Sequence, residues 1–224
     1  MLVDASSSLN VSIYFYTTEQ EYTLIILSKE QISQEVIKIT SNAESVFFIR
    51  TAYLKLVKSE EIIENAEFLD AKENDILNAV FSFAAESKAL EYLSRAEHSR
   101  FLLTKKLIEK KYEKQFIENA LDYLEYKNYL SDERFCHAWL NSRKINHSEG
   151  RIKLSAELSV RGIDRKLSEK VLNEYFKENS EYELCKKDAK KAQKNLVDPQ
   201  KIIRKLISHG FSYSMIKKVL SEAL

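Results

Sequence analysis

One pattern of apolar residues occurs three times in this chain, about every 50 residues. Gly162 in the second copy and Gly210 in the third directly precede an apolar residue, where the first copy has Lys111. Glycine at this place is typical of the left-handed residue that closes a helix. Repeats of this kind bury their apolar faces against one another and against neighbouring copies, so we predict an elongated tandem array. The apolar positions of the copies are Leu103, Leu107, Tyr112, Ala120 and Leu121, then Leu154, Leu158, Ile163, Val171 and Leu172, then Ile202, Leu206, Phe211, Val219 and Leu220.

The second copy alone does not decide between helix and strand, because apolar and polar residues alternate over residues 152–160. The third copy favours a helix: residues 202, 203, 206 and 207 are apolar, and Asp198-Pro199 is a helix-start signal. Three glycines and one proline in 224 residues also favour helices, because sheet-rich folds need many turn residues. We predict a mainly α fold of three three-helix repeats (71–127, 128–179 and 180–224) after a small α+β N-terminal region (1–70).

Local signals place helices within the first two repeats. The periodicity predicts a long helix from residue 71 to about residue 95, with Ser99 as the cap of the next helix. In the middle repeat we predict Asp132 as the N-cap of a helix, followed by a turn at residues 147–150. The predicted buried face of that helix contains Phe135, Ala138 and Trp139.

The N-terminal region has strand signals and one helix signal. Residues 11–16 and 22–27 are rich in β-branched and aromatic residues and flank a polar turn, so they predict a hairpin. Ser28 with Gln31 predicts a capping box for a short helix over residues 29–39. Residues 46–50 suit a third strand, residues 51–57 could equally be helical, and residues 59–70 have no clear pattern.

Charge divides the chain. Residues 1–78 have 6 Lys and Arg against 13 Asp and Glu, whereas residues 79–224 have 29 against 21. A basic body is suited to a negatively charged partner, although solvated Lys/Glu helix faces explain the same counts. Two cysteines make no disulfide framework, no apolar run is long enough for a membrane span, and the first residues do not resemble a signal peptide, so we expect a cytoplasmic protein.

Catalytic and metal-binding patterns are not found. Three scattered glycines cannot form a phosphate loop, and the four histidines are isolated in the sequence. Cys136 and His137 are adjacent, and neighbours on a helix point about 100° apart, so packing is the better interpretation of Cys136 and also of Cys185. Capping explains Asp132 better than a catalytic acid pair with Glu133. We therefore predict no enzyme activity, no cofactor and no metal.

Basic residues cluster in two places. One group surrounds the middle repeat, from Arg143 to Lys166. The other follows the first helix of the third repeat, where the spacing of Lys187, Lys190, Lys191 and Lys194 makes a cationic stripe on one face. Such stripes neutralise phosphates or acidic protein surfaces, or are simply solvated.

Three stretches carry a family resemblance. They are residues 89–107 (ALEYLSRAEHSRFLLTKKL), 129–143 (YLSDERFCHAWLNSR) and 150–163 (GRIKLSAELSVRGI). They resemble the RecX family of RecA regulators, with YLDD-x-RFA-x-x-(W/F)-(V/I)-x-x-R as the most specific motif. With a looser third unit, the likeness covers about residues 71–224. Ser131 replaces the first acid of that motif, Ser-Glu-Gly replaces Gly-Pro before Arg151, and Arg161 replaces a lysine.

The resemblance implies a helical protein that binds in the groove of the RecA–DNA filament and inhibits ATP hydrolysis and strand exchange, in recombination, repair and the SOS response. RecA is then the expected partner of a monomeric chain that binds DNA weakly alone and no membrane. Arg134 and Arg143, which belong to the matched motif, are equally suited to tying helices together. The candidate partner or DNA contacts are Arg134, Arg143, Lys144, Arg151, Lys153, Arg161, Arg165, Lys187, Lys190, Lys191, Lys194 and Arg204.

An alternative hypothesis is a free-standing nucleic-acid-binding protein, because tandem short helices with basic faces resemble stacked helix-turn-helix units. That hypothesis predicts tight binding to naked DNA with a steep dependence on salt. The filament hypothesis predicts weak binding to naked DNA and saturable binding to RecA filaments.

Overall fold

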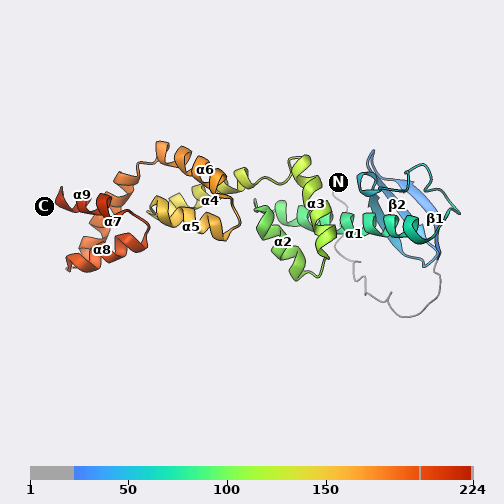
Figure 1. Ribbon diagram of the computed structural model, residues 1–224, viewed down its shortest axis with the longest axis horizontal. Helices are drawn as coiled ribbons and strands as arrows, with labels where there is room; N and C mark the ends of the chain where they lie inside the picture. The colour runs from blue at the N-terminus through green and yellow to red at the C-terminus, as the bar shows by residue number, and fades with distance from the viewer. Residues whose placement is uncertain (1–22, 197, 223–224) are drawn as a thin grey trace. The chain divides into compact units, whose positions relative to one another are not determined.

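The computed structural model describes residues 23–196 and 198–222, which form two compact units divided between Leu77 and Asn78 (Figure 1). The first unit contains a four-stranded antiparallel sheet with the strand order β3-β2-β1-β4. Its strands are β1 (Leu24–Gln31), β2 (Val36–Ser41), β3 (Val46–Arg50) and β4 (Glu67–Phe68). The second unit is helical. Among the described helices, none is long and apolar enough to cross a membrane.

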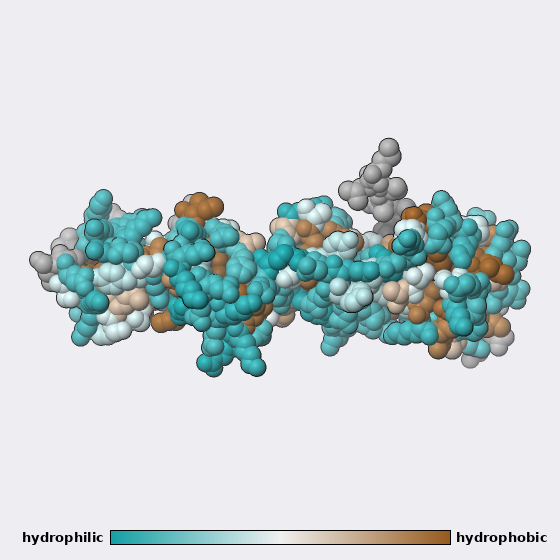
Figure 2. Space-filling view, turned by 90° about the horizontal axis from the view of Figure 1, so that it is seen from above, coloured by the Kyte–Doolittle hydropathy of each residue, from teal (hydrophilic) through white to brown (hydrophobic). Residues whose placement is uncertain are grey.

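The sheet is held by a row of β-branched residues on one face. Ile37 pairs with Ile49 in the β2–β3 ladder, and both side chains are fully buried together with Ile26 and Ile39. Other apolar residues of this unit are exposed, and Figure 2 shows hydrophobic patches over it. They include Leu27, Val46, Leu56, Ile63 and Leu69.

A buried carboxylate joins the first unit's loop to the start of α1 (Asp70–Leu93). Asp75, only 5% exposed, accepts hydrogen bonds from the backbone amides of Lys55, Leu56 and Val57 at 2.8–3.0 Å. Three consecutive backbone amides donate to one carboxylate. Residues 55–57 therefore have hydrogen-bond partners although they belong to no helix or strand. Residues 51–57, which could equally be helical by sequence, contain only the single 3₁₀ turn η1 (Thr51–Tyr53).

The predicted helix over residues 29–39 is wrong. Residues 24–31 and 36–41 are strands β1 and β2, and Ser28 Oγ donates to Thr40 Oγ1 across them at 2.9 Å instead of capping a helix. Val36, Ile37 and Ile39 are β-branched and suit a pleated, half-buried strand. This preference outweighs the helix-start signal of Ser28 and Gln31. The third strand is confirmed as β3. The predicted strand over residues 11–16 lies outside the described residues.

The second unit consists of three consecutive helix triplets. Figure 1 shows α1–α3, α4–α6 and α7–α9 as separate groups, and each triplet has its own core cluster. The long first helix is confirmed as α1, which begins in the first unit. The other helices are α2 (Arg100–Glu109), α3 (Lys114–Tyr126), α4 (Asp132–Asn146), α5 (Arg151–Val160), α6 (Arg165–Glu178), α7 (Glu181–Asn195), α8 (Pro199–Ser208) and α9 (Tyr213–Ser221).

The repeat register is confirmed by burial. Of the fifteen apolar positions in the three copies, all are buried except Tyr112 and Leu220, which are half-buried. The turn after the second helix is left-handed in every copy, with φ of 69° at Lys111, 79° at Gly162 and 86° at Gly210. The first copy therefore makes the same turn without a glycine. The equivalence also extends to the first helices, where the buried small residues are Ala85, Cys136 and Cys185.

Helix caps are confirmed in two places and corrected in a third. Ser99 caps α2, and Asp198 with Pro199 begins α8. The cap of α4 is Ser131, whose side chain accepts from Arg134 N at 3.3 Å, whereas Asp132 is the first helical residue. The Asp132 carboxylate instead accepts from the backbone N of Arg100 at 2.7 Å. A long-range partner thus replaces the predicted local one.

Two further details of the middle repeat differ from prediction. Ala138 is exposed, and the core side of α4 is made by Phe135, Cys136 and Leu140, with Trp139 half-buried. The predicted turn at residues 147–150 is an extended connection, since His147 and Gly150 both have extended backbone angles. The helix therefore presents a face rotated by about one position from the predicted one.

Leu158→Ala tests the repeat register. Leu158 is fully buried in the α5 core position, so its truncation should lower the free energy of unfolding by about 2–5 kcal/mol. The matched control is Ile152→Ala on the same helix, whose side chain is 61% exposed. Chemical denaturation measures both; equal effects of the two substitutions would contradict the register.

Ser168→Ala should stabilise the protein. Ser168 is buried on α6, and its hydroxyl has no hydrogen-bond partner among the described residues, whereas the equivalent residues Ile117 and Ile216 are apolar. Removing an unsatisfied buried hydroxyl should raise the free energy of unfolding by about 1 kcal/mol. Thermal and chemical unfolding measure the change, with the cap substitution Ser99→Ala as the contrast that should destabilise. A decrease for Ser168→Ala would show that the hydroxyl has a bound partner.

Candidate binding surface

Arg134 is used inside the protein. Its guanidinium donates to Glu97 Oε1 at 2.9 Å, to Asn128 Oδ1 at 2.7 Å and to the carbonyl of Tyr129 at 2.9 Å. These acceptors lie before α2 and in the connection from α3 to α4. Arg134 therefore ties the first repeat to the start of the second. Of the two roles considered for this residue, the structure shows the one in which it holds helices together.

Arg143 and Lys153 share a buried carboxylate. Glu149, with a side chain 4% exposed, accepts from Arg143 Nε at 2.9 Å and Nη2 at 2.5 Å, and Lys153 Nζ lies 2.8 Å away. Burial disfavours the ionised form of Glu149, but these two cations outweigh burial and hold its pKa below the usual value. The sequence signal for this site was the Ser-Glu-Gly that departs from the family's Gly-Pro.

Three of the other predicted basic residues of the middle repeat also have protein partners. Arg151 donates to Asn173 Oδ1 at 2.8 Å and lies 5.0 Å from the ring centre of Phe176. Arg161 donates to Glu157 Oε2 at 2.5 Å and stacks on Trp139. Arg165 pairs with Glu169, but its side chain is 90% exposed, and Lys144 is exposed at the end of α4. Of the middle-repeat candidates, these last two are the most accessible.

Glu149→Gln tests the buried carboxylate and its pH dependence. We expect a loss of about 1.5–3 kcal/mol at pH 7, because a hydrogen-bonded charge is removed from a buried site. Since the folded-state pKa lies below the usual 4.5, this stabilisation is present above that pH and is lost as the pH falls through the folded-state pKa. Urea denaturation of wild type and variant at several pH values measures the difference. The control, Glu169→Gln at an exposed pair, should change stability little.

If the difference between wild type and Glu149→Gln were the same at pH 7 and at pH 3, the carboxylate would not be the stabilising group.

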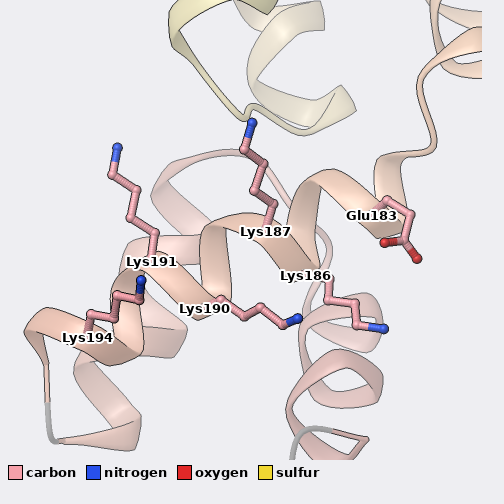
Figure 3. Close-up of a pocket in the computed structure, with 6 residues that line it drawn as sticks. All are labelled: Glu183, Lys186, Lys187, Lys190, Lys191 and Lys194. Atoms are coloured by element: carbon pink, nitrogen blue, oxygen red, sulfur yellow. The ribbon is translucent and has the colours of Figure 1, made fainter.

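A lysine comb lies along α7. We use this name for Lys186, Lys187, Lys190, Lys191 and Lys194, which together with Glu183 line an open depression of about 430 Å³ (Figure 3). The opposite face of the helix is buried through Cys185, Ala189 and Ala192, so packing turns the lysines outward. Lys187, Lys190 and Lys194 are exposed and form no ion pair with any described residue. On α8, Arg204 is exposed as well.

Buried Asp188 on the lysine-bearing helix α7 pairs with half-buried His209. Asp188 is 5% exposed, and its Oδ2 lies 2.6 Å from His209 Nδ1, linking α7 to the residue that follows α8. Sequence reasoning missed this pair, because the two residues are 21 positions apart and show no local motif.

Glu133, His137 and Glu174 bring three potential metal-ligand atoms within 4.8 Å of one another. The sequence does not reveal this cluster, because Glu174 comes from α6 and the other two from α4. Glu133 is already paired with Lys170 Nζ at 2.7 Å, which lowers the pKa of the carboxyl and supplies the positive charge that a cation would bring. We assign no metal centre here.

The two cysteines are packing residues. Both are fully buried, and burial raises the pKa of the Cys136 thiol to about 12 and that of Cys185 to about 11. Thiols with such values hold little thiolate at neutral pH, so neither is suited to nucleophilic chemistry.

Comparison with known proteins gives matches over the helical repeats and, for some relatives, over the N-terminal region as well. Residues 85–124 match the family description "RecX, first three-helix domain", and residues 131–172 match "RecX, second three-helix domain". A protein of Treponema pallidum (strain Nichols) named "Regulatory protein RecX" is 31% identical over 139 residues, which cover 62% of this chain and 85% of that protein. The chain belongs to the RecX family.

Other RecX proteins match a longer part of the chain. "Regulatory protein RecX" of Clostridioides difficile (strain 630) is 27% identical over 208 residues, 89% of this chain and 96% of that protein. A solved structure titled "Crystal structure of regulatory protein RecX" has a TM-score of 0.70 at 21% identity, covering 88% of this chain and 99% of the other. RecX from Lactobacillus salivarius has a TM-score of 0.56 at 22% identity, covering 63% of this chain and 96% of the other. These two likenesses show the fold.

The two RecX domain matches end at residue 172, before the lysine comb. The matched part contains Arg134, Arg143 and Glu149, whose contacts are internal. The accessible cations of the third repeat thus lie beyond the segments by which the family is recognised.

Proposed function

We propose that this RecX chain is a non-enzymatic regulator that binds the groove of the RecA–DNA filament in the cytoplasm. There it inhibits ATP hydrolysis and strand exchange, in DNA recombination, repair and the SOS response. The observation that carries the proposal is the lysine comb, an accessible cationic face on a chain whose relatives are named regulatory proteins. A filament offers DNA phosphates and acidic protein surface, and both are suited to such a face.

The lysine comb is a better contact than the arginines of the middle repeat. Moving Arg143 to a partner would leave the Glu149 carboxylate buried with one cation fewer, which is energetically costly. Lys187, Lys190 and Lys194 have no such cost, because these exposed lysines exchange water for an anion. Lys187, Lys190 and Lys194 lie on one face at helical spacing, so they can meet a row of anions together.

Reversing the charge of Lys187, Lys190, Lys191 and Lys194 to Glu should weaken the regulator. We expect the concentration for half-inhibition of the filament ATPase to rise at least about tenfold, equivalent to 1.4 kcal/mol. A RecA ATPase assay on single-stranded DNA, titrated with each protein, measures it, and circular dichroism checks the fold. The matched control reverses four exposed lysines elsewhere, Lys55, Lys58, Lys110 and Lys114, with the same change in net charge. Wild-type inhibition by the first variant would show that the comb is only solvated.

The second candidate function is a free-standing nucleic-acid-binding protein, which the same lysine comb favours. Binding to naked DNA at several salt concentrations separates the two functions. Tight binding, with a log–log salt slope that falls by about one for each phosphate-facing lysine removed, supports the DNA binder. Weak binding to DNA with saturable binding to RecA filaments at physiological salt supports the regulator.

A further inference from the structure

The second and third repeats are joined by the start of α5 and the turn after α8. Gly150 N donates to the carbonyl of His209 at 2.8 Å, and Ile152 N donates to that of Gly210 at 3.2 Å. The amide of Arg151, between them, donates to Glu181 Oε1 at 2.8 Å, and Glu181 is the first residue of α7. The free amides at the start of α5 are thus satisfied by the next repeat.

The first and second repeats are joined in the same way. Ser99 Oγ donates to the carbonyl of Arg161 at 2.7 Å, and Arg161 precedes the left-handed Gly162 just as His209 precedes Gly210. The amide of Arg100 donates to Asp132, the first residue of α4. The two junctions therefore use equivalent positions: the start of one repeat's second helix contacts the glycine turn and the first acidic helix residue of the next repeat.

Glycine at the turn leaves room for the incoming helix. A Cβ at Gly162 would lie 2.2 Å from Phe101 Cβ, and one at Gly210 would lie 2.4 Å from the backbone N and the Cβ of Lys153. Both distances are far below any real contact between such atoms. A side chain at this position therefore excludes a docked repeat, whatever the backbone conformation.

The positions equivalent to these contacts differ at both ends of the array. At the turn of the first repeat, Lys111 has the same left-handed backbone but carries an exposed side chain where an incoming helix would lie. At the start of α8, Pro199 occupies the place of Arg100 and Arg151, and proline has no amide hydrogen to donate. Asp198 has the position of Ser99 and Gly150, but its carboxylate cannot donate as the Ser99 hydroxyl does. The carboxylate instead accepts from Gln200 N at 2.9 Å, and Gln200 is the counterpart of Ile152, whose amide donates to the next repeat. Asp198 and Pro199 are both exposed.

We infer that the array is closed at both ends, so that the interface joining its repeats cannot join two copies of the chain. This interface fits another repeat of the same kind. A second copy of the chain contains such repeats, so an open end could bind one of them. The Lys111 side chain excludes an incoming helix at one end by its volume. At the other end a following turn and helix would lose two donors, because Pro199 has no amide hydrogen and the amide of Gln200, the counterpart of Ile152, already donates to Asp198 Oδ1. The closure prevents head-to-tail filaments of this chain, a known hazard of open heterologous contacts.

Opening the two ends separately gives a direct test. One variant carries Lys111→Gly, and the other carries Asp198→Ser with Pro199→Arg, which restores the residue types found at the first junction. We expect wild type and each variant alone to remain monomeric in sedimentation velocity, whereas a mixture of the two variants forms a 1:1 complex. A chain with all three substitutions should show a mass that increases with concentration. A monomer for the triple variant at every concentration, or self-association of wild type, would overturn the inference.

A second variant tests the junction itself. Arg151→Pro removes the amide that donates to Glu181, at a first helical position that proline tolerates. We expect hydrogen exchange in α7–α9 to become faster while α1–α3 is unchanged and the helical circular dichroism is retained. The control is Ile152→Ala, which keeps every donor. Unchanged exchange in α7–α9 of Arg151→Pro would show that these donors do not hold the junction, and it would also overturn the inference.

Discussion

The helical unit depends on one backbone feature, the left-handed turn that closes the second helix of each repeat. This turn lets the chain reverse toward the third helix, and it presents carbonyl groups that the preceding repeat's helix start can contact. A helix start has unsatisfied amides, and a helix end has unsatisfied carbonyls, so placing one against the other satisfies both in a single junction. Tandem assembly therefore follows from the needs of the helix ends as much as from burial of apolar side chains.

Charge serves two different purposes in this RecX protein. In the middle repeat, arginines are paired with carboxylates and aromatic rings, and Glu149 is buried between two cations. In the third repeat, the α7 lysines extend from a helix whose other face is packed against the core. The first group stabilises the arrangement of helices, whereas Lys187, Lys190 and Lys194 of the second group are exposed and form no ion pair with any described residue. Basic residues of the two repeats thus have different surroundings: Arg143 and Lys153 share one buried carboxylate, whereas Lys187, Lys190 and Lys194 face outward from α7.

The repeat pattern was predictable because burial is periodic. Leu154 and Leu158 lie one turn apart, and the equivalent residues in the other two copies share this spacing, so each copy supports the assignment of the others. The lysine comb was predictable for the same reason, since helical spacing alone defines a face. The short helix over residues 29–39 was wrong because a capping box is a local signal, and strand pairing over Val36–Ser41 is a longer-range and stronger one.

By itself, the sequence determined the three-helix repeats, their register, the left-handed positions at Gly162 and Gly210 and the cationic face of α7, because each depends on residues near one another along a helix. Tertiary structure alone decided that Asp132 binds the amide of Arg100, that Arg143 is bound by Glu149, and that Lys111 takes the glycine's backbone angle. These depend on which atoms meet across helices and repeats. Periodicity specifies which face is buried, but not which partner a polar group finds there.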